Sequence, residues 1–350
     1  LKTVRNKGKE FVMKMNQVIS GWQSGVEQLW AGETSSARKN KRRVKKIWRV
    51  LFSVGRAIFL FSLCLVLLYP LLIMISIAFR NPSELYDPTV VWIPKHFTLS
   101  SFRLVFEKLD LTAALWQTVI ITIIGTLCQL ISCMLAGYGF ARFRFPCKKL
   151  LFGVLLLMII VPPQVVTIPS MMDFQRFDFF GIGQIAGLFT GTPLTVSLRD
   201  TLWAYFLPAL LGNGIKSGLF IFIFIQFFRG LPDELQDAAY IDGCGRLRTF
   251  AVIMMPLAGA AILTVTLFSI VWYWNDSYFS VIHFDNLQTV SSFLQGIKSA
   301  ISDTSSGIRE IERIPVTQAS AVVAIAPLLV MYILLQRYFT ESIERTGIVG

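Results

Sequence analysis

Long apolar stretches alternate with short polar ones along most of the chain. Six stretches are apolar over roughly the 20 residues that an α-helix needs to cross a bilayer. They cover residues 57–78, 111–138, 150–172, 202–228, 257–274 and 316–335. This pattern predicts an all-α, polytopic membrane protein with six transmembrane helices.

Two of the predicted spans contain interruptions. Pro162 and Pro163 remove intrahelical hydrogen bonds from the third span, so that helix must bend or open there. In the fourth span, the sequence Gly-Asn-Gly-Ile-Lys-Ser-Gly at residues 212–218 separates two apolar segments. If the helix continues through these glycines to Arg229, Lys216 lies about 20 Å from the cytoplasmic boundary, inside the outer third of a hydrocarbon core about 30 Å thick. The second span carries three polar side chains that are expected to face other helices or a cavity: Gln117, Gln129 and Ser132.

Composition supports the membrane assignment. Hydrophobic residues make up 54% of the chain and charged residues 15%, and the mean hydropathy is +0.60. The net charge of +12 is concentrated in residues 1–49, which carry +10. Basic charge beside a first hydrophobic span indicates a cytoplasmic N-terminus, reinforced by anionic membrane lipid, and requires no nucleic acid partner.

Residues 1–46 are predicted to be a cytoplasmic extension, and residues 47–350 the membrane domain. Apolar residues between Phe11 and Trp30 recur at helical spacing beside several lysines. This spacing fits a helix lying in the membrane interface, and a poorly ordered tail is the alternative.

A polar segment at residues 230–256 separates the fourth and fifth spans. Pro232, Asp233 and Glu234 are typical of a helix start, and a short helix is predicted to follow, to Ile241. Gly243 and Gly245 allow a tight turn, after which residues 246–255 are predicted to form a second helix before Pro256. By itself this pattern also fits an ordinary amphipathic connection.

The spacing of residues in this segment is more specific. Asp237-Ala238-Ala239, three residues, Gly243, nine residues, Ile253, one residue and Met255-Pro256 resembles the EAA loop, E-A-A-x3-G-x9-I-x-L-P. That loop is found in the permease subunits of binding-protein-dependent ABC importers. Residues 240–243 look like the carbohydrate-uptake branch of the maltose and glycerol-phosphate type. Three positions depart from the family pattern with little change of charge sign or size: Asp237 for Glu, Cys244 for Ala and Met255 for Leu.

The resemblance extends over roughly residues 47–350 and implies a type I ABC importer permease in the bacterial inner membrane, with both termini cytoplasmic. It implies a second homologous permease subunit, two ABC ATPase subunits, an extracytoplasmic solute-binding protein and a saccharide substrate. The chain would be a transport subunit and no enzyme, binding no cofactor itself, because ATP and Mg²⁺ belong to the partner ATPases. The residues implied to couple the chain to those ATPases are Glu234, Asp237, Ala238, Ala239, Asp242, Gly243 and Pro256.

Polar residues near the outer ends of the fourth and fifth spans are candidates for the translocation pathway: Asn213, Lys216, Ser217, Trp274, Asn275 and Asp276. Lys216 either snorkels outward or faces a wet cavity. Trp274 is either an aromatic anchor at the membrane interface or part of a gate. Asp276 fits a helix-end contact as well as a functional role.

Other functional classes find less support. A secondary transporter would need ionisable residues inside the membrane, and apart from Lys216 the spans offer almost none. A membrane enzyme would need a catalytic or metal-binding cluster, which the sequence lacks. Residues 214–217 are similar to the end of a P-loop, but Gly and Lys are not adjacent and the segment lies within a span. The alternative that stays open is an ABC permease for another solute, such as a peptide or an ion.

Overall fold

The computed structural model describes residues 15, 18, 20–22 and 35–347, apart from 91, 180, 304 and 305. For residues 35–44, 186 and 337–347 it describes the backbone alone. The interfacial helix predicted within residues 1–46 therefore falls mostly outside the described residues. The chain divides into two compact units, Leu1–Leu71 and Leu72–Gly350, and the division falls inside one long helix, α2 (Ser35–Ala78).

The described part of the second unit is built from helices. In this part of the chain, extended segments pair at only two isolated β-bridges, which join Arg80 to Phe97 and Phe177 to Val196. The helices after α2 are α3 (Ser100–Lys108), α4 (Leu111–Arg142), α5 (Lys148–Ile160), α6 (Pro163–Gln175), α7 (Ile182–Thr190), α8 (Trp203–Leu210), α9 (Ser217–Gly230), α10 (Glu234–Ile241), α11 (Arg246–Thr249), α12 (Met255–Leu257), α13 (Gly259–Asn275), α14 (Tyr278–His283), α15 (Val290–Ser302) and α16 (Arg313–Gly347). Short 3-10 turns lie at Pro82–Glu84 and Glu310–Glu312, and a π-helical turn at Phe250–Met254 joins α11 to α12.

Three helical stretches among the described residues are long and apolar enough to cross a membrane: Lys45–Ala78, Leu111–Arg142 and Glu310–Gln336. Two more qualify if each bent pair forms one span: Lys148–Ile160 with Pro163–Gln175, bent by 103°, and Arg246–Leu257 with Gly259–Asn275, bent by 77°. The bend expected at Pro162 and Pro163 is confirmed. The predicted fourth span does not qualify, because its apolar segments form two short helices, α8 and α9.

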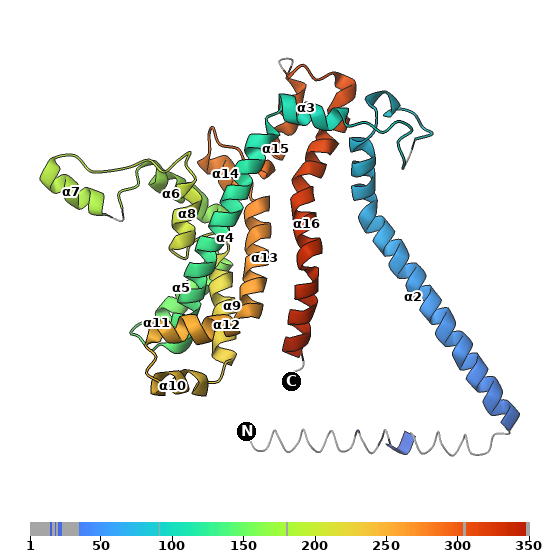
Figure 1. Cartoon of the computed structure of the whole chain (residues 1–350), viewed down its shortest axis with the longest axis horizontal. Coiled ribbons are helices and arrows are strands. Elements are labelled where there is room, and N and C mark those ends of the chain that lie inside the picture. The colour runs from blue at the N-terminus through green and yellow to red at the C-terminus, as the bar shows by residue number, and fades with distance from the viewer. Residues whose placement is uncertain are drawn as a thin grey trace. The chain divides into compact units, whose positions relative to one another are not determined.

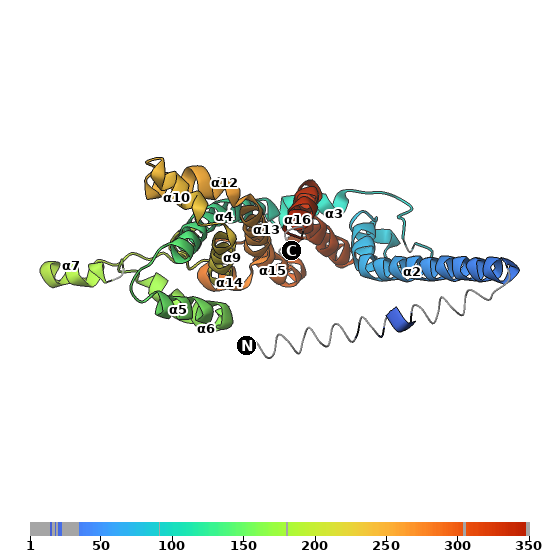
Figure 2. The same ribbon diagram turned by 90° about the horizontal axis from the view of Figure 1, so that it is seen from below.

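Helix α4 is the central element of the second unit. It packs against α9, α13 and α8. Helices α4, α9 and α13 lie side by side in both views (Figure 1 and Figure 2). Gly137 allows α4 to approach α9 closely because it has no side chain. A Cβ added at this position would lie only 2.4 Å from Cβ of Phe224. Apolar residues of α4 and α9 form a core with residues of the π-helical turn. A second core joins α3, the start of α4, α15 and α16.

Candidate functional site

The segment between α9 and α13, here called the coupling loop (residues 231–258), forms two helical stretches joined by a turn, as predicted. The first, α10, begins at Glu234, two residues after the predicted start at Pro232. The second is less regular than predicted. It passes from α11 through the π-helical turn into α12, which contains Pro256.

Gly243 ends α10 in a left-handed conformation, with φ of 77°. The Cys244 amide donates to the Ala239 carbonyl at 2.9 Å, and the Gly243 amide donates to the Tyr240 carbonyl at 3.1 Å. These two bonds form a Schellman motif, which satisfies the last carbonyls of the helix and favours glycine at the left-handed position. The glycine in the sequence motif is therefore required by the backbone of this turn.

Phe250 anchors the second half of the coupling loop in the hydrophobic core formed with α4 and α9. Its side chain is buried, and its ring centroid lies 4.9 Å from that of Tyr138 on α4. Tyr138 also contacts Phe228 at the end of α9, with a centroid distance of 5.4 Å. A displacement of the loop would therefore move residues that pack directly on α4 and α9.

Arg142, the last residue of α4, fixes the first half of the coupling loop. Its guanidinium forms an ion pair with Asp233 and donates to the Leu231 carbonyl at 2.7 Å. The Arg142 side chain is only 5% exposed. Sequence reasoning missed this contact, because Arg142 lies outside the motif. Its position at the end of a long apolar span, facing the acidic helix start at Asp233, was the available signal.

The outer face of the coupling loop combines acidic and apolar side chains. Glu234, Asp237, Ala238, Asp242 and Pro256 are exposed, whereas Ala239 is buried. The alanine pair of the motif is thus divided between an outward and an inward position. Ile241 and Leu247 are 86% and 80% exposed. This face has the chemistry of a surface that a protein partner covers.

The fourth span is broken at residues 211–216. Gly212 and Lys216 have φ values of 75° and 60°, and α9 begins only at Ser217. The helix does not continue through these glycines, because the two left-handed residues redirect the chain. The condition under which the depth of Lys216 was calculated is therefore not met. Asn213 and Lys216 are exposed at the break. The Lys216 ammonium lies 4.7 Å from the centre of the Trp272 ring on α13.

Polar side chains of α4 hold the broken segment in place. Gln129, which is fully buried, donates to the Ile215 carbonyl at 2.5 Å and to Oγ of Ser217 at 3.3 Å. The hydroxyl of Ser132 donates to the Ala209 carbonyl at 2.6 Å. The prediction that these two polar residues face other helices is confirmed. Ser217 is buried against Gln129, whereas Asn213 and Lys216 are accessible.

Residues 274–276 lie at the end of α13 and have three different environments. Trp274 is buried, and its indole nitrogen donates to the Ala324 carbonyl on α16 at 3.0 Å. Asn275 is exposed and its amide donates to the Val271 carbonyl at 2.9 Å. Trp274 is therefore a contact between helices in this structure and not an anchor exposed to an interface.

Asp276 makes the helix-end contact that was one of its two interpretations. Its carboxylate accepts from the backbone amides of Phe279 and Ser280 at the start of α14, at 3.3 and 3.2 Å. The hydroxyl of Tyr205 on α8 also donates to it at 2.6 Å. Sequence reasoning missed Tyr205, although a tyrosine within an apolar span needs a hydrogen-bond partner.

The candidate residues do not gather at one point. The coupling loop and the break in the fourth span lie at opposite ends of α9, and residues 274–276 lie at the far end of α13 from the coupling loop (Figure 1). The described residues contain no group of three His, Cys, Asp or Glu side chains placed to hold a metal ion. His283, the last residue of α14, is fully buried.

Comparison with known families identifies the chain. Residues 129–345, more than half of the sequence, match the family of binding-protein-dependent transport system inner membrane components. The chain belongs to this family. The permease resembles an arabinooligosaccharide transport system permease of Halalkalibacterium halodurans, with 26% identity over 89% of the chain and 100% of the relative. It also resembles a polygalacturonan/rhamnogalacturonan transport system permease of Bacillus subtilis, with 27% identity over 81% of the chain and 93% of the relative.

The permease also shares its fold with a solved structure. A chain of a bacterial ABC transporter involved in the import of the acidic polysaccharide alginate superposes with a TM-score of 0.66. The sequence identity is 19%, and the match covers 83% of the permease and 96% of that chain. The ABC importer permease fold predicted from the EAA-like spacing is thereby confirmed.

Proposed function

We propose that the permease is the transmembrane subunit of an ABC importer that takes up a sugar or oligosaccharide. The observation that carries this proposal is the coupling loop, an exposed helix-turn-helix surface anchored by Arg142 and Phe250 in a permease fold. The named relatives transport arabinooligosaccharides and polygalacturonan/rhamnogalacturonan, and a further one in Bacillus subtilis imports melibiose, raffinose and stachyose. These names favour a saccharide over a peptide or an ion.

The proposed topology has six spans, with both termini in the cytoplasm. The third span is formed by α5 and α6, and the fourth by α8 and α9 around the break. Two observations support this orientation. Basic residues are concentrated before the first span, and Arg142 joins the basic end of α4 to the coupling loop.

ATP hydrolysis would take place in two separate ATPase subunits that bind Mg²⁺ and ATP. A groove on each ATPase would receive a coupling loop. The exposed face of the loop would carry Glu234, Asp237, Ala238 and Asp242. Ala239 would pack behind this face, Gly243 would form the turn, and Pro256 would lie in the last helix of the loop. A second, homologous permease would complete the pathway, and a solute-binding protein would deliver the substrate. A structure of an alginate ABC transporter of similar fold, in complex with a periplasmic protein that carries an alginate pentasaccharide, supports the part proposed for the solute-binding protein. Closure of the ATPases would then move the loop, and its contacts with α4 and α9 would pass the motion to the spans.

Asn213 and Lys216 are the pathway residues that we propose for substrate contact. Both are exposed, and the Lys216 ammonium is held over the Trp272 ring at 4.7 Å from its centre. The lysine would donate hydrogen bonds to hydroxyl or carboxylate groups of a saccharide. Ser217, Trp274, Asn275 and Asp276 would support this region by holding the helix ends.

Uptake assays test the proposed function. Cells that express the complete transporter should accumulate labelled oligosaccharides, and cells lacking the permease should not. Lys216→Met and Asn213→Leu should reduce uptake at unchanged protein abundance. Accumulation of dipeptides in place of saccharides would contradict the proposed substrate class. Unchanged uptake in both variants would show that the break at residues 211–216 does not line the translocation pathway.

A further inference from the structure

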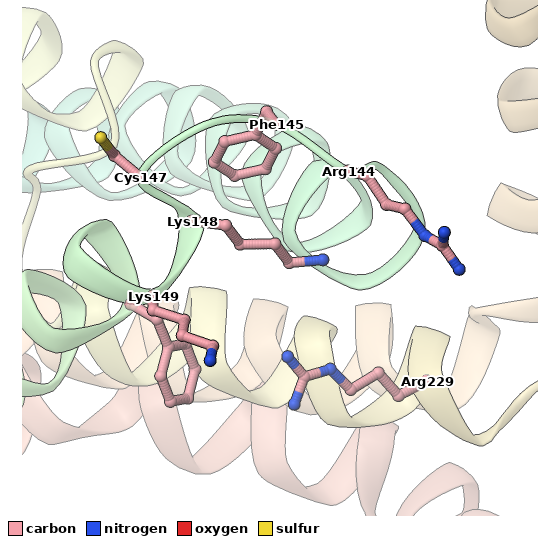
Figure 3. Close-up of a pocket in the computed structure, with 7 residues that line it drawn as sticks. Arg144, Phe145, Cys147, Lys148, Lys149 and Arg229 are labelled. Atoms are coloured by element: carbon pink, nitrogen blue, oxygen red, sulfur yellow. The ribbon is translucent and has the colours of Figure 1, made fainter.

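A basic pocket lies beside the turn that joins α4 to α5. It has a volume of about 650 Å³ and is lined by Arg144, Phe145, Cys147, Lys148, Lys149, Phe152 and Arg229. Figure 3 shows that the side chains of Lys148 and Arg229 extend toward the same space from two different helices, α5 and α9. Four of the seven lining residues are positively charged and none is acidic.

Within the part of the chain that the structure describes, these cations have no carboxylate partner. None of the ion pairs found among the described residues includes Arg144, Lys148, Lys149 or Arg229. Lys148 donates to the Phe143 carbonyl at 2.8 Å, and its ammonium lies 5.8 Å from the centre of the Phe145 ring. The Arg229 guanidinium lies 5.6 Å from the centre of the Phe152 ring. An anion in the pocket would reduce the mutual repulsion of these groups and gain several charge-assisted hydrogen bonds.

The surface that leads away from the pocket is apolar. On the face of α5 that carries Lys148, Lys149 and Phe152, the next two turns present Leu156 and Ile159, both of which are exposed in this chain. A ligand that fits both regions has a negatively charged head and a hydrocarbon tail. Inorganic phosphate or a nucleotide would match the cations but would leave the apolar surface uncovered.

We propose that this pocket binds the headgroup phosphate of an anionic phospholipid, with an acyl chain along α5. The assignment to the cytoplasmic leaflet rests on the proposed orientation of the permease, since Arg229 immediately precedes the coupling loop. Basic pockets between membrane helices on that side of a bilayer recognise anionic lipid headgroups. A bound lipid would link the end of α9 to the start of α5, next to the element that meets the ATPase.

Cys147 provides a reporter at the edge of the pocket (Figure 3). It is a free, exposed thiol among the lining residues, and Cys244 is a second free thiol outside the pocket, on the coupling loop. The full-length permease, purified in detergent with its associated subunits, is treated with a soluble maleimide. Peptide mass spectrometry then follows the labelling rate of each cysteine in the presence of phosphatidylglycerol, phosphatidylcholine or millimolar inorganic phosphate.

Phosphatidylglycerol should slow the labelling of Cys147 several-fold and leave Cys244 unchanged, whereas phosphatidylcholine and inorganic phosphate should have little effect. Each basic group near a membrane surface strengthens anionic lipid binding by a factor of about five. Lys149→Gln with Arg229→Gln should therefore raise the phosphatidylglycerol concentration needed for protection by roughly 25-fold. Both side chains are exposed, so the double variant should fold. Lys45→Gln with Lys46→Gln removes the same charge elsewhere and should leave the protection intact.

Equal protection by phosphatidylcholine, or unchanged protection in the Lys149→Gln and Arg229→Gln variant, would overturn the proposal. Protection by inorganic phosphate alone would identify an ion site and also overturn it. Protection that requires a partner protein and no lipid would assign the pocket to a protein interface instead. The readout needs no transport, so a permease that binds the lipid but imports no saccharide would contradict the proposed function alone.

Discussion

Single residues decide how closely the helices of the permease approach one another, and Gly137 is the clearest case. An added Cβ at this position would meet Cβ of Phe224 at 2.4 Å, while one at Gly139, half a turn later in α4, meets nothing within 4 Å. The sequence marks neither glycine as different from the other. The distinction arises from the side of α4 that faces α9, which only the packed structure defines.

Gly137→Ala should therefore destabilise the permease by about 1–3 kcal/mol through overpacking. Gly139→Ala is the matched control, and it should be neutral or slightly stabilising because alanine is the better helix former. Thermal unfolding of the two detergent-solubilised variants would measure this difference. Equal unfolding temperatures would show that the contact between α4 and α9 is looser than the structure indicates.

Asp200 has a different role, because it clamps two loops at the far end of the unit from the coupling loop. Its carboxylate accepts hydrogen bonds from the Asn286 side chain and from the backbone amides of residues 285–287. The side-chain bond from Asn286 and these backbone bonds lower the pKa of Asp200 from 3.8 to about 2, against a smaller opposing effect of burial. The clamp therefore contributes its full stability above the ordinary pKa and loses it as the pH falls toward 2.

The stability difference between the wild-type protein and Asp200→Asn should thus be constant from pH 7 to about pH 5 and should shrink below pH 4. Thermal unfolding of both proteins across this range would test the expectation. A difference that stays constant down to pH 3 would mean that another group, and not Asp200, carries the pH dependence.

At the scale of elements, the sequence indicated most helices and the places where two spans are interrupted, but not the conformation of the second interruption. Apolar runs predicted α4 and α16, and the paired prolines predicted the bend between α5 and α6, because proline acts locally. The break between α8 and α9 depends on Gln129 and Ser132, which lie about 80 residues away in the sequence and bond to its carbonyl groups. Such long-range partners leave no local signal. The first helix and the turn of the coupling loop were predictable because the motif specifies the turn at Gly243. The π-helical turn in its second half and its anchor Arg142 were not.

Gln129→Leu should loosen the break in the fourth span. The substitution leaves the Ile215 carbonyl and the Ser269 hydroxyl, which also bonds to Gln129, without their buried partner. Losing such a bond costs about 1–3 kcal/mol. A lower unfolding temperature is expected for Gln129→Leu, and little change for Gln226→Leu, whose side chain is exposed on α9. Similar values for both variants would show that the break holds its shape without Gln129.

At the scale of the whole molecule, our central claim is that energy enters the permease through the coupling loop. The loop is exposed on one face and packed on α4 and α9 on the other, so a partner that binds the outer face can move the spans. Gly243 and Gly245 form a matched pair for testing this claim. Neither has an atom within 4 Å of an added Cβ, but only Gly243 has a positive φ.

The most direct measurement is ATP hydrolysis by the complete transporter in proteoliposomes, stimulated by the substrate-loaded binding protein. Gly243→Val should abolish the stimulation while all subunits still purify together, because valine cannot adopt the left-handed turn without strain. Gly245→Val should retain it, since the extended backbone at Gly245, with φ of −70° and ψ of 163°, suits a β-branched residue. Full stimulation in the Gly243→Val transporter would contradict the account.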